Sequence, residues 1–437
     1  MKKSKKIILT ISAVTLTAGV LLTGVGYMLG GRFGFVFSDG KFISADNMEQ
    51  EKLPFVLEKE KLDPVKNIDI RISSYADIEV LPSKDNAFYL EYTLPGEYPD
   101  PVFECADGTL TLSQENREPI AVFGFGLSGS AYSDQKVTLY VPEKAELSSC
   151  KLYSDSGNIQ VSGLTASDFG LGCDYGDVIL KNVTGKEQVL LTLNSGDFTA
   201  DTISGKTVTV NNDSGSLSLN NCTSDDLHLE SDYGDIHLDH VTVKRASNLT
   251  LDSGDLTIQD SSIGTAKITD ESGNMSLSNT TGVSLDLTSE YGDVSFTDTK
   301  LSENATFLLD SGDFSADNTT FKTISVKNDS GNISLNRFSS ETADFALSYG
   351  DFDLVAAKAG SLSCTNEIGD ISIQLPDKFD SYGFDLVTEY GEISLPTDQN
   401  DALIREDESS GKVSFQTNSE AKYQIQAECE DGNIEIK

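Results

Sequence analysis

The sequence of 437 residues predicts an all-β protein, a parallel β-helix (β-solenoid) of about fifteen turns of about 19 residues, preceded by an N-terminal transmembrane helix and a β cap. One complete turn of the solenoid is called a coil below. Three observations predict this fold. Glycines beside acidic or amide residues recur every 19 or 20 residues, apolar and polar residues alternate on both sides of each glycine, and proline is nearly absent from the regular region.

The N-terminal segment has the composition of a membrane anchor. Residues 1–6 form a basic tail with four lysines, and the run from Ile7 to Leu29 carries no charge. A helix of this length extends about 34 Å, enough to cross a hydrocarbon core of about 30 Å. We therefore expect an anchor over residues 7–30, with the N-terminus in the cytoplasm and the remainder outside. A cleaved signal peptide is the alternative, although no small-residue cleavage site follows the run.

Two less regular regions precede the solenoid. Residues 31–60 are predicted as a juxtamembrane segment containing the run GRFGFVF, and residues 61–150 as a capping β region. The cap contains the strand-like stretches NIDIRISSYADIEVLP, ECADGTLTLSQ and KVTLYVP, with Ala76 where a glycine would be expected. A glycine-rich apolar insertion from Ile120 to Ser133 is compatible with a buried loop, a membrane-touching flap or a partner site.

The regular solenoid is predicted over residues 151–375, and each glycine is expected to form a corner between two half-buried strands. Apolar residues occupy the positions five before and two and four after each glycine, with a weaker apolar column seven after. The repeated glycines are Gly157, Gly176, Gly196, Gly215, Gly234, Gly254, Gly273, Gly292, Gly312, Gly331, Gly350 and Gly369.

A longer period is superimposed on the short one. Tyr175, Tyr233, Tyr291 and Tyr349 each directly precede a glycine and are 58 residues apart, which is three coils. The first three follow a small residue two positions earlier, so we expect their rings to fill the corner beside that residue. Tyr349 follows Leu347 and departs from this pattern.

The C-terminal residues 376–437 are predicted to form irregular coils and a cap. Corners are expected at Gly391, Gly411 and Gly432, at wider intervals than in the regular region. The final strand carries Glu435 and Lys437, whose charges are expected to discourage end-to-end stacking of two rods.

Carboxylates two residues before and one residue after the glycines form two columns. In stacked coils they would repel one another at about 4.8 Å, which weak calcium binding would relieve. We favour a structural role at the turns, because Asp and Asn bond their own backbone there, and expect no cofactor. The candidates for a cation ladder are Asp174, Asp177, Asp232, Asp235, Asp252, Asp255, Asp310 and Asp313.

Other residue types give little sign of chemistry. Every coil carries the same acidic set, so no pair is singled out for catalysis, and we expect no enzyme. The histidines His228, His237 and His240 suggest zinc by spacing, but a solvent-exposed position is preferred. No disulfide is expected in the solenoid, and a disulfide between Cys105 and Cys150 is the one pairing that the sequence does not exclude. The net charge of −38 argues against nucleic-acid binding.

The anchor, the NIDIRISSYADIEV opening, the KVTLYVP strand and the serial SDSGNI and SDYGDI repeats resemble the bacterial β-strand-repeat proteins labelled "putative adhesin". These are domains of unknown function, common in Gram-positive bacteria, and no catalytic residues are defined in them. The resemblance implies either a surface-interaction module or an accessory component of a cell-envelope stress-response system. It implies a single-pass protein of the cell membrane, with an extracellular solenoid and an unidentified protein or cell-envelope ligand.

Overall fold

The computed structural model describes residues 35–38, 41–44, 53–115, 121–123, 135–396, 403–405 and 411–437. The predicted anchor at residues 7–30 lies outside these ranges. Within them, no helix has the length and apolar character needed to span a membrane.

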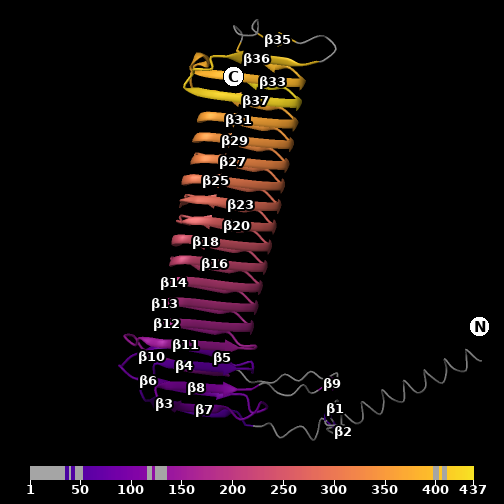
Figure 1. Ribbon diagram of the computed structural model, residues 1–437. Helices are drawn as coiled ribbons and strands as arrows, with labels where there is room; N and C mark the ends of the chain where they lie inside the picture. The colour runs from indigo at the N-terminus through magenta and orange to yellow at the C-terminus, as the bar shows by residue number, and fades with distance from the viewer. Residues whose placement is uncertain are drawn as a thin grey trace, which may run out of the picture.

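The chain forms a straight stack of β-coils, with the N-terminal strands at one end and the C-terminal strands at the other (Figure 1). The first three long strands, β12 (Ile159–Tyr175), β13 (Val178–Ser195) and β14 (Phe198–Ser214), each run through almost a whole coil. The regular part has about 12 turns, and the all-β solenoid predicted from the sequence is confirmed. The count of about fifteen, which included the irregular ends, stays a prediction.

Beyond β14, each coil divides into a short strand after the glycine and a longer strand before the next glycine. The short strands are β15 (Leu217–Asn220), β17 (Ile236–Asp239), β19 (Leu256–Gln259), β21 (Met275–Ser278), β24 (Val294–Thr297), β26 (Phe314–Asp317), β28 (Ile333–Asn336), β30 (Phe352–Val355) and β32 (Ile371–Gln374). The longer strands are β16 (Thr223–Tyr233), β18 (Thr242–Ser253), β20 (Thr265–Ser272), β23 (Ser284–Tyr291), β25 (Lys300–Ser311), β27 (Thr320–Ser330), β29 (Ser339–Tyr349) and β31 (Lys358–Ile368), with the two-residue β22 (Thr281–Gly282) before β23.

Equivalent positions of neighbouring coils pair in parallel register. Leu217 pairs with Ile236, which pairs with Leu256, and the same holds for the outward residues between them. The inward columns therefore line up into one continuous core of buried Leu, Ile, Val and Phe side chains. A single coil could not bury these side chains alone, so the stability of each coil depends on its neighbours.

A second corner lies six residues after each glycine and was not identified from the sequence. The residue there adopts a left-handed backbone in coil after coil, for example Asn221 (φ 54°), Asp260 (φ 48°) and Asn318 (φ 53°). Asn and Asp tolerate this conformation better than other non-glycine residues. Their recurrence at this position was the available signal. The apolar column seven after the glycine follows directly and is buried as predicted, with Val183 and Val241 as examples.

The N-terminal end mixes parallel and antiparallel pairing. Its strands are β3 (Phe55–Leu62), β4 (Asn67–Ile72), β5 (Asp77–Ser83), β6 (Phe88–Leu94), β7 (Val102–Ala106), β8 (Thr109–Gln114), β10 (Lys136–Pro142) and β11 (Leu147–Ser154). Strands β4 and β5 pair in parallel with β11 and β12, so they extend the stack, whereas β3, β6 and β7 pair antiparallel. Ala76 takes the corner position, and its carbonyl oxygen lies against Gly157.

A separate small sheet joins the juxtamembrane segment to the apolar insertion. Strand β1 (Phe35–Ser38) pairs antiparallel with β2 (Lys41–Ser44) and with β9 (Ala121–Phe123). Most of the insertion from Ile120 to Ser133 lies outside the described residues.

The C-terminal coils are not stacked in sequence order. After β32 and a single 3₁₀ turn (Phe379–Ser381), β33 (Tyr382–Tyr390) and β34 (Ile393–Ser394) form an outer coil. The last strands, β37 (Tyr423–Asp431) and β38 (Ile434–Ile436), then insert between that coil and β31–β32 (Figure 1).

Two predictions about this end are therefore wrong. Gly411 is not a corner of the stack, because it precedes β36 (Val413–Thr417), which pairs antiparallel with β33. The final strand with Glu435 and Lys437 is an inner strand, because β38 is bonded on both sides. The outer coil is covered instead by β36 and by β35 (Ile404–Arg405), so antiparallel strands end the rod.

Candidate interaction surface

The glycine corner is a site of close backbone approach. At Gly292 the backbone has φ 135°, and a Cβ atom there would lie 1.8 Å from the carbonyl oxygen of Gly273 in the preceding coil. Only glycine satisfies both the conformation and the contact. The glycine repeat is therefore an architectural requirement of the stack.

The carboxylates that directly follow the glycines tie neighbouring coils together. The Oδ1 atom of Asp235 accepts the backbone N–H of Asp255 at 2.9 Å, and the Oδ1 atom of Asp255 accepts that of Asn274 at 2.8 Å. Asp177 and Asp313 make the same contact with Asp197 and Asn332. The expectation that these residues bond their own turn is corrected: each bonds the amide of the following coil.

The carboxylates two residues before the glycines lie on the outer side of the corner. Asp174 accepts hydrogen bonds from the side chains of Tyr153 (2.7 Å) and Asn194 (3.1 Å). Asp232, Asp252 and Asp310 occupy the equivalent place in other coils. In many coils, therefore, a carboxylate or amide side chain lies two residues before the glycine and another lies one residue after it.

Replacing Asp255 with alanine is expected to lower the free energy of unfolding by about 1 kcal/mol, because the amide of Asn274 loses its acceptor. Replacement with asparagine is expected to change it by less than about 0.5 kcal/mol, because asparagine occupies the same position at Asn158, Asn274 and Asn332. Thermal melting of the two variants checks this, and equal melting temperatures for both would contradict it.

The tyrosines that precede the glycines point into solvent. Tyr175, Tyr233 and Tyr291 are 61–65% exposed, so the prediction that their rings fill the corner is wrong, and Tyr349 is 57% exposed. The chain bends outward at the glycine, and therefore the residues from two before to one after it lie on the outside of the bend. The strict alternation of inward and outward side chains is therefore interrupted at the glycine.

The tyrosine row continues past the point where the sequence period ends. Tyr349 pairs with Ile368, Ile368 with Asp431, and Asp431 with Tyr390, because the inserted strand β37 supplies the coil between. Tyr390 is therefore three coils beyond Tyr349, although only 41 residues separate them in the chain. It is 62% exposed. The sequence could not show this spacing, since it depends on the swapped strand order.

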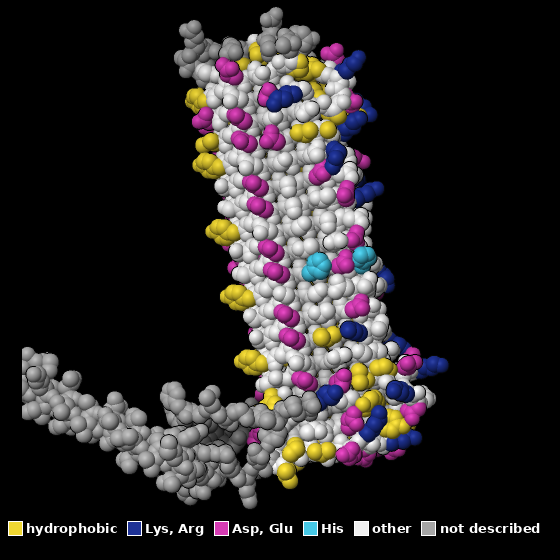
Figure 2. Space-filling model, turned by 180° about the vertical axis from the view of Figure 1, so that it is seen from behind, with side chains coloured by type: hydrophobic (Ala, Val, Ile, Leu, Met, Phe, Trp, Pro, Cys, Tyr) yellow, Lys and Arg dark blue, Asp and Glu magenta, His cyan; other side chains and the backbone are white. Residues whose placement is uncertain are grey.

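One edge of the rod is acidic and carries exposed apolar side chains, whereas basic side chains gather on the opposite edge. Figure 2 shows hydrophobic side chains projecting at regular steps along one edge, with a line of acidic side chains beside them. Lysines and arginines gather on the other edge. Several lysines of the solenoid pair with carboxylates of a neighbouring coil, as in Lys322–Glu303 and Lys206–Glu187. We call the row of exposed tyrosines with its flanking carboxylates the tyrosine edge.

A recess of about 390 Å³ lies on the outer face beside the C-terminal part of the tyrosine edge. Glu367, Glu430 and Glu389 line it, each two residues before its glycine in successive coils, together with Glu428. Among the described residues, none of these four glutamates has an ion-pair partner at hydrogen-bond distance. Lys327 also lines the recess, and its Nζ lies 3.2 Å from Asp329 Oδ1.

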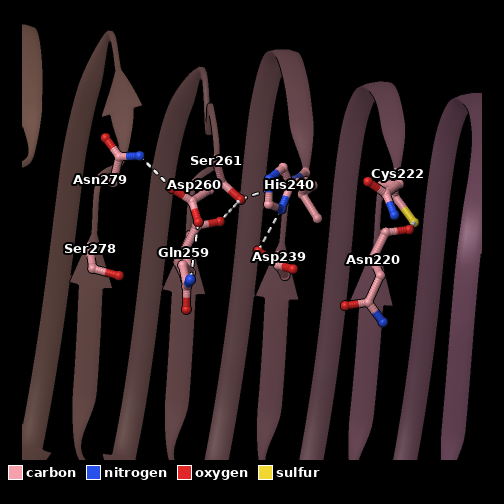
Figure 3. A network of polar contacts seen from close by, with 12 residues as sticks. Asn220, Cys222, Asp239, His240, Gln259, Asp260, Ser261, Ser278 and Asn279 are labelled. Carbon is pink, nitrogen blue, oxygen red and sulfur yellow. Dashed lines mark hydrogen bonds and ion pairs between the residues drawn. The ribbon is translucent and has the colours of Figure 1, made fainter.

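The second corner carries a small polar network that includes one histidine (Figure 3). His240 Nδ1 lies 2.7 Å from Asp239 Oδ1, and Asp260 of the next coil accepts hydrogen bonds from Gln259 and Asn279. One potential ligand atom from each of Asp239, His240 and Asp260 lies within 4.8 Å of the others. His228 and His237 occupy outward positions of β16 and β17 and do not join this group.

All six cysteines have free thiols, and five of them are buried. Burial raises the pKa of the Cys150 thiol to about 12 and those of Cys173 and Cys222 to about 11. Thiols with such pKa values are poor nucleophiles near neutral pH. The cysteines therefore act as small core residues.

A family model described as Toastrack DUF4097 matches residues 65–259, 205–315 and 260–437 of this chain. No curated protein matches this chain.

Three solved structures match the chain with low sequence identity and low TM-score. A putative cell adhesion protein from Clostridium sporogenes is 11% identical over 88% of this chain and 99% of its own, with a TM-score of 0.18. A putative lipid binding protein from Parabacteroides distasonis is 16% identical over 68% and 96%, with a TM-score of 0.25. A putative adhesin from Bacteroides fragilis is 14% identical over 68% and 97%, with a TM-score of 0.21.

Proposed function

The chain belongs to the Toastrack DUF4097 family, and on that premise we propose that it is a non-enzymatic interaction module of the bacterial cell surface. In this proposal the uncharged run from Ile7 to Leu29 anchors the protein in the cell membrane, and the solenoid extends outside the cell. The rod then presents a long surface to a partner protein or a cell-envelope ligand.

The observation that carries this proposal is the tyrosine edge. Tyr is enriched at protein interfaces, so a regular row of exposed tyrosines along one edge supports a contact surface. Here five tyrosines recur at steps of three coils along one edge. The core needs none of them, because serine stands at the same position in the coils between, as at Ser195, Ser253 and Ser311.

A non-enzymatic role is supported by the uniformity of the coils. The carboxylates after the glycines bond backbone amides in coil after coil, so no pair of them has an environment suited to acid and base roles. We propose that calcium is not needed for this arrangement. Calcium and a chelator at matched ionic strength are expected to give the same melting temperature, and a calcium-dependent rise would show that the columns bind the ion.

The competing role, an accessory component of an envelope stress-response system, can be separated by shortening the solenoid. Deletion of residues 176–349, three blocks of 58 residues, joins Tyr175 to Gly350 and so keeps the corner register. We expect cells with this variant to lose attachment to a binding surface while a stress reporter gives the same output as in wild-type cells. If deletion of the whole gene changes the reporter and the shortened chain restores it, the interaction role is contradicted.

A further inference from the structure

We propose that the tyrosine edge is a docking surface for an extended, positively charged peptide segment that runs parallel to the rod axis. This inference rests on the proposed interaction role and names the class of partner. The arginine or lysine side chains of the segment contact the tyrosine rings and the carboxylates on either side of them.

The first support is the charge of the edge. The tyrosines are flanked by carboxylates, for example Asp232 directly before and Asp235 two positions after Tyr233. Lysines and arginines gather on the opposite edge in Figure 2, and the whole chain has a net charge of −38. Lys327 is an exception, because it lines the recess and pairs with Asp329. A cation over an exposed aromatic ring and beside carboxylates gains from both interactions.

The second support is the acidic recess at the C-terminal part of the edge. Glu367, Glu428 and Glu430 belong to the two coils that separate Tyr349 from Tyr390, and Glu389 directly precedes Tyr390. The exposed side chain of Ile368 lies between the two tyrosines. The recess of about 390 Å³ has room for a long basic side chain. Because the glutamates lack ion-pair partners among the described residues, such a side chain would supply the missing positive charge.

The third support is a match of lengths. Three coils at about 4.8 Å place successive tyrosines about 14 Å apart. Four residues of an extended chain rise about 13.6 Å, and residues four apart point to the same face. An extended segment with a basic residue at every fourth position thus brings one cation to each tyrosine. The spacing survives the strand insertion at the C-terminal end, where Tyr390 belongs to no 58-residue block.

The test measures binding of a fluorescent peptide to the purified chain by anisotropy at low ionic strength. The peptide carries arginine at every fourth residue with serine and threonine between, and a second peptide has the same composition in shuffled order. The variants are Tyr349→Ser with Tyr390→Ser, and Glu389→Gln with Glu430→Gln. Matched controls are Leu308→Ser, which removes an exposed apolar side chain from another position, and Asp286→Asn with Asp353→Asn, which remove two exposed charges.

We expect each edge variant to weaken binding of the ordered peptide about tenfold, with unchanged melting temperature, and the controls to bind as the wild type does. The shuffled peptide is expected to bind at least about tenfold more weakly. Three results would overturn the inference: no binding to the wild type, equal binding of the shuffled peptide, or edge variants that bind normally.

Attachment of cells that display the same variants separates this inference from the proposed function. Peptide binding alone decides the inference, and attachment alone decides the interaction role. If wild-type cells attach but the purified chain does not bind the peptide, the interaction role stands and the partner class is wrong.

Discussion

Replacing Asp270 with asparagine is expected to raise the free energy of unfolding by about 2–4 kcal/mol at about pH 8 and to change it little at about pH 4. Asp270 lies three residues before Gly273 in an inward column, and only 1% of its surface is exposed. Neither carboxyl oxygen makes a well-formed hydrogen bond within the described residues. It is the one acidic residue among the buried polar side chains of the described coils.

The same column shows what the fold requires at this position. Asn328 donates a hydrogen bond to the carbonyl oxygen of Gly312 at 3.0 Å, and Asn366 donates one to that of Gly350 at 2.8 Å. A carboxyl group can donate such a bond only when it is protonated, whereas asparagine donates at any pH. The Asp270→Asn variant therefore supplies the donor that the position favours.

The pH dependence follows from the direction of the pKa shift. Burial raises the pKa of Asp270 to about 7, and the charges of Asp255 and Asp252 add to this, while the Ser272 amide opposes it. In the unfolded chain the pKa is about 3.9, so the folded state binds the proton more tightly. The contribution of Asp270 to stability is complete below about pH 4 and is lost as the pH rises to about 7.

The reciprocal change serves as the control. Asn328→Asp is expected to lower the melting temperature at about pH 8 and to matter less at about pH 4, because it places a buried carboxylate in an equivalent site. Thermal melts at both pH values check the pair. A Tm difference between Asp270→Asn and the wild type that does not vary with pH would contradict the account.

Replacing Gly292 with alanine is expected to lower the free energy of unfolding by more than about 3 kcal/mol. The new Cβ atom would lie 1.8 Å from the carbonyl oxygen of Gly273, and φ is 135°. The atom it meets belongs to the backbone of the neighbouring coil, so relief requires the two coils to separate. Because coils stabilise one another only through their neighbours, the effect is expected to be local to these coils.

Hydrogen exchange measures this loss directly, since the amides of β20 and β23, which end directly before Gly273 and Gly292 and pair with each other, should lose protection before those of distant coils. Gly108→Ala is the control, because Gly108 also has positive φ, at 73°, but a Cβ atom added there would have no neighbouring atom within 4 Å. That variant is expected to cost about 1–2 kcal/mol from backbone conformation alone. Equal losses for the two glycines would show that the close approach of coils does not matter.

The regular solenoid could be predicted from the sequence because each coil repeats the same local pattern. Leu229, Gly234 and Ile236 occupy the inward, corner and inward positions that alternation predicts, and the register of each coil fixes the next. The candidate interaction surface was only partly predictable. Tyr233 was identified, but its direction was predicted wrongly, because the bend at Gly234 interrupts the alternation from which that direction was inferred.

The C-terminal order could not be predicted in the same way. In the sequence, Gly391 and Gly432 look like two later corners of the same series. Nothing in the local sequence shows that the corner at Gly432 lies between those at Gly369 and Gly391. That choice is made by pairing between strands far apart in the chain, β31 with β37 and β37 with β33. The position of Tyr390 in the tyrosine row, and the glutamate recess beside it, both follow from this non-local step.

The central claim is that the repeated glycines and aspartates build the rod, whereas the exposed tyrosines bind a partner. Its most direct test replaces Tyr175, Tyr233, Tyr291, Tyr349 and Tyr390 together with serine, the residue that many other coils carry at this position. The measurement is attachment of cells that display this variant at the wild-type level. The predicted result is loss of attachment with an unchanged melting temperature of the purified chain. Attachment equal to that of the wild type would contradict the claim.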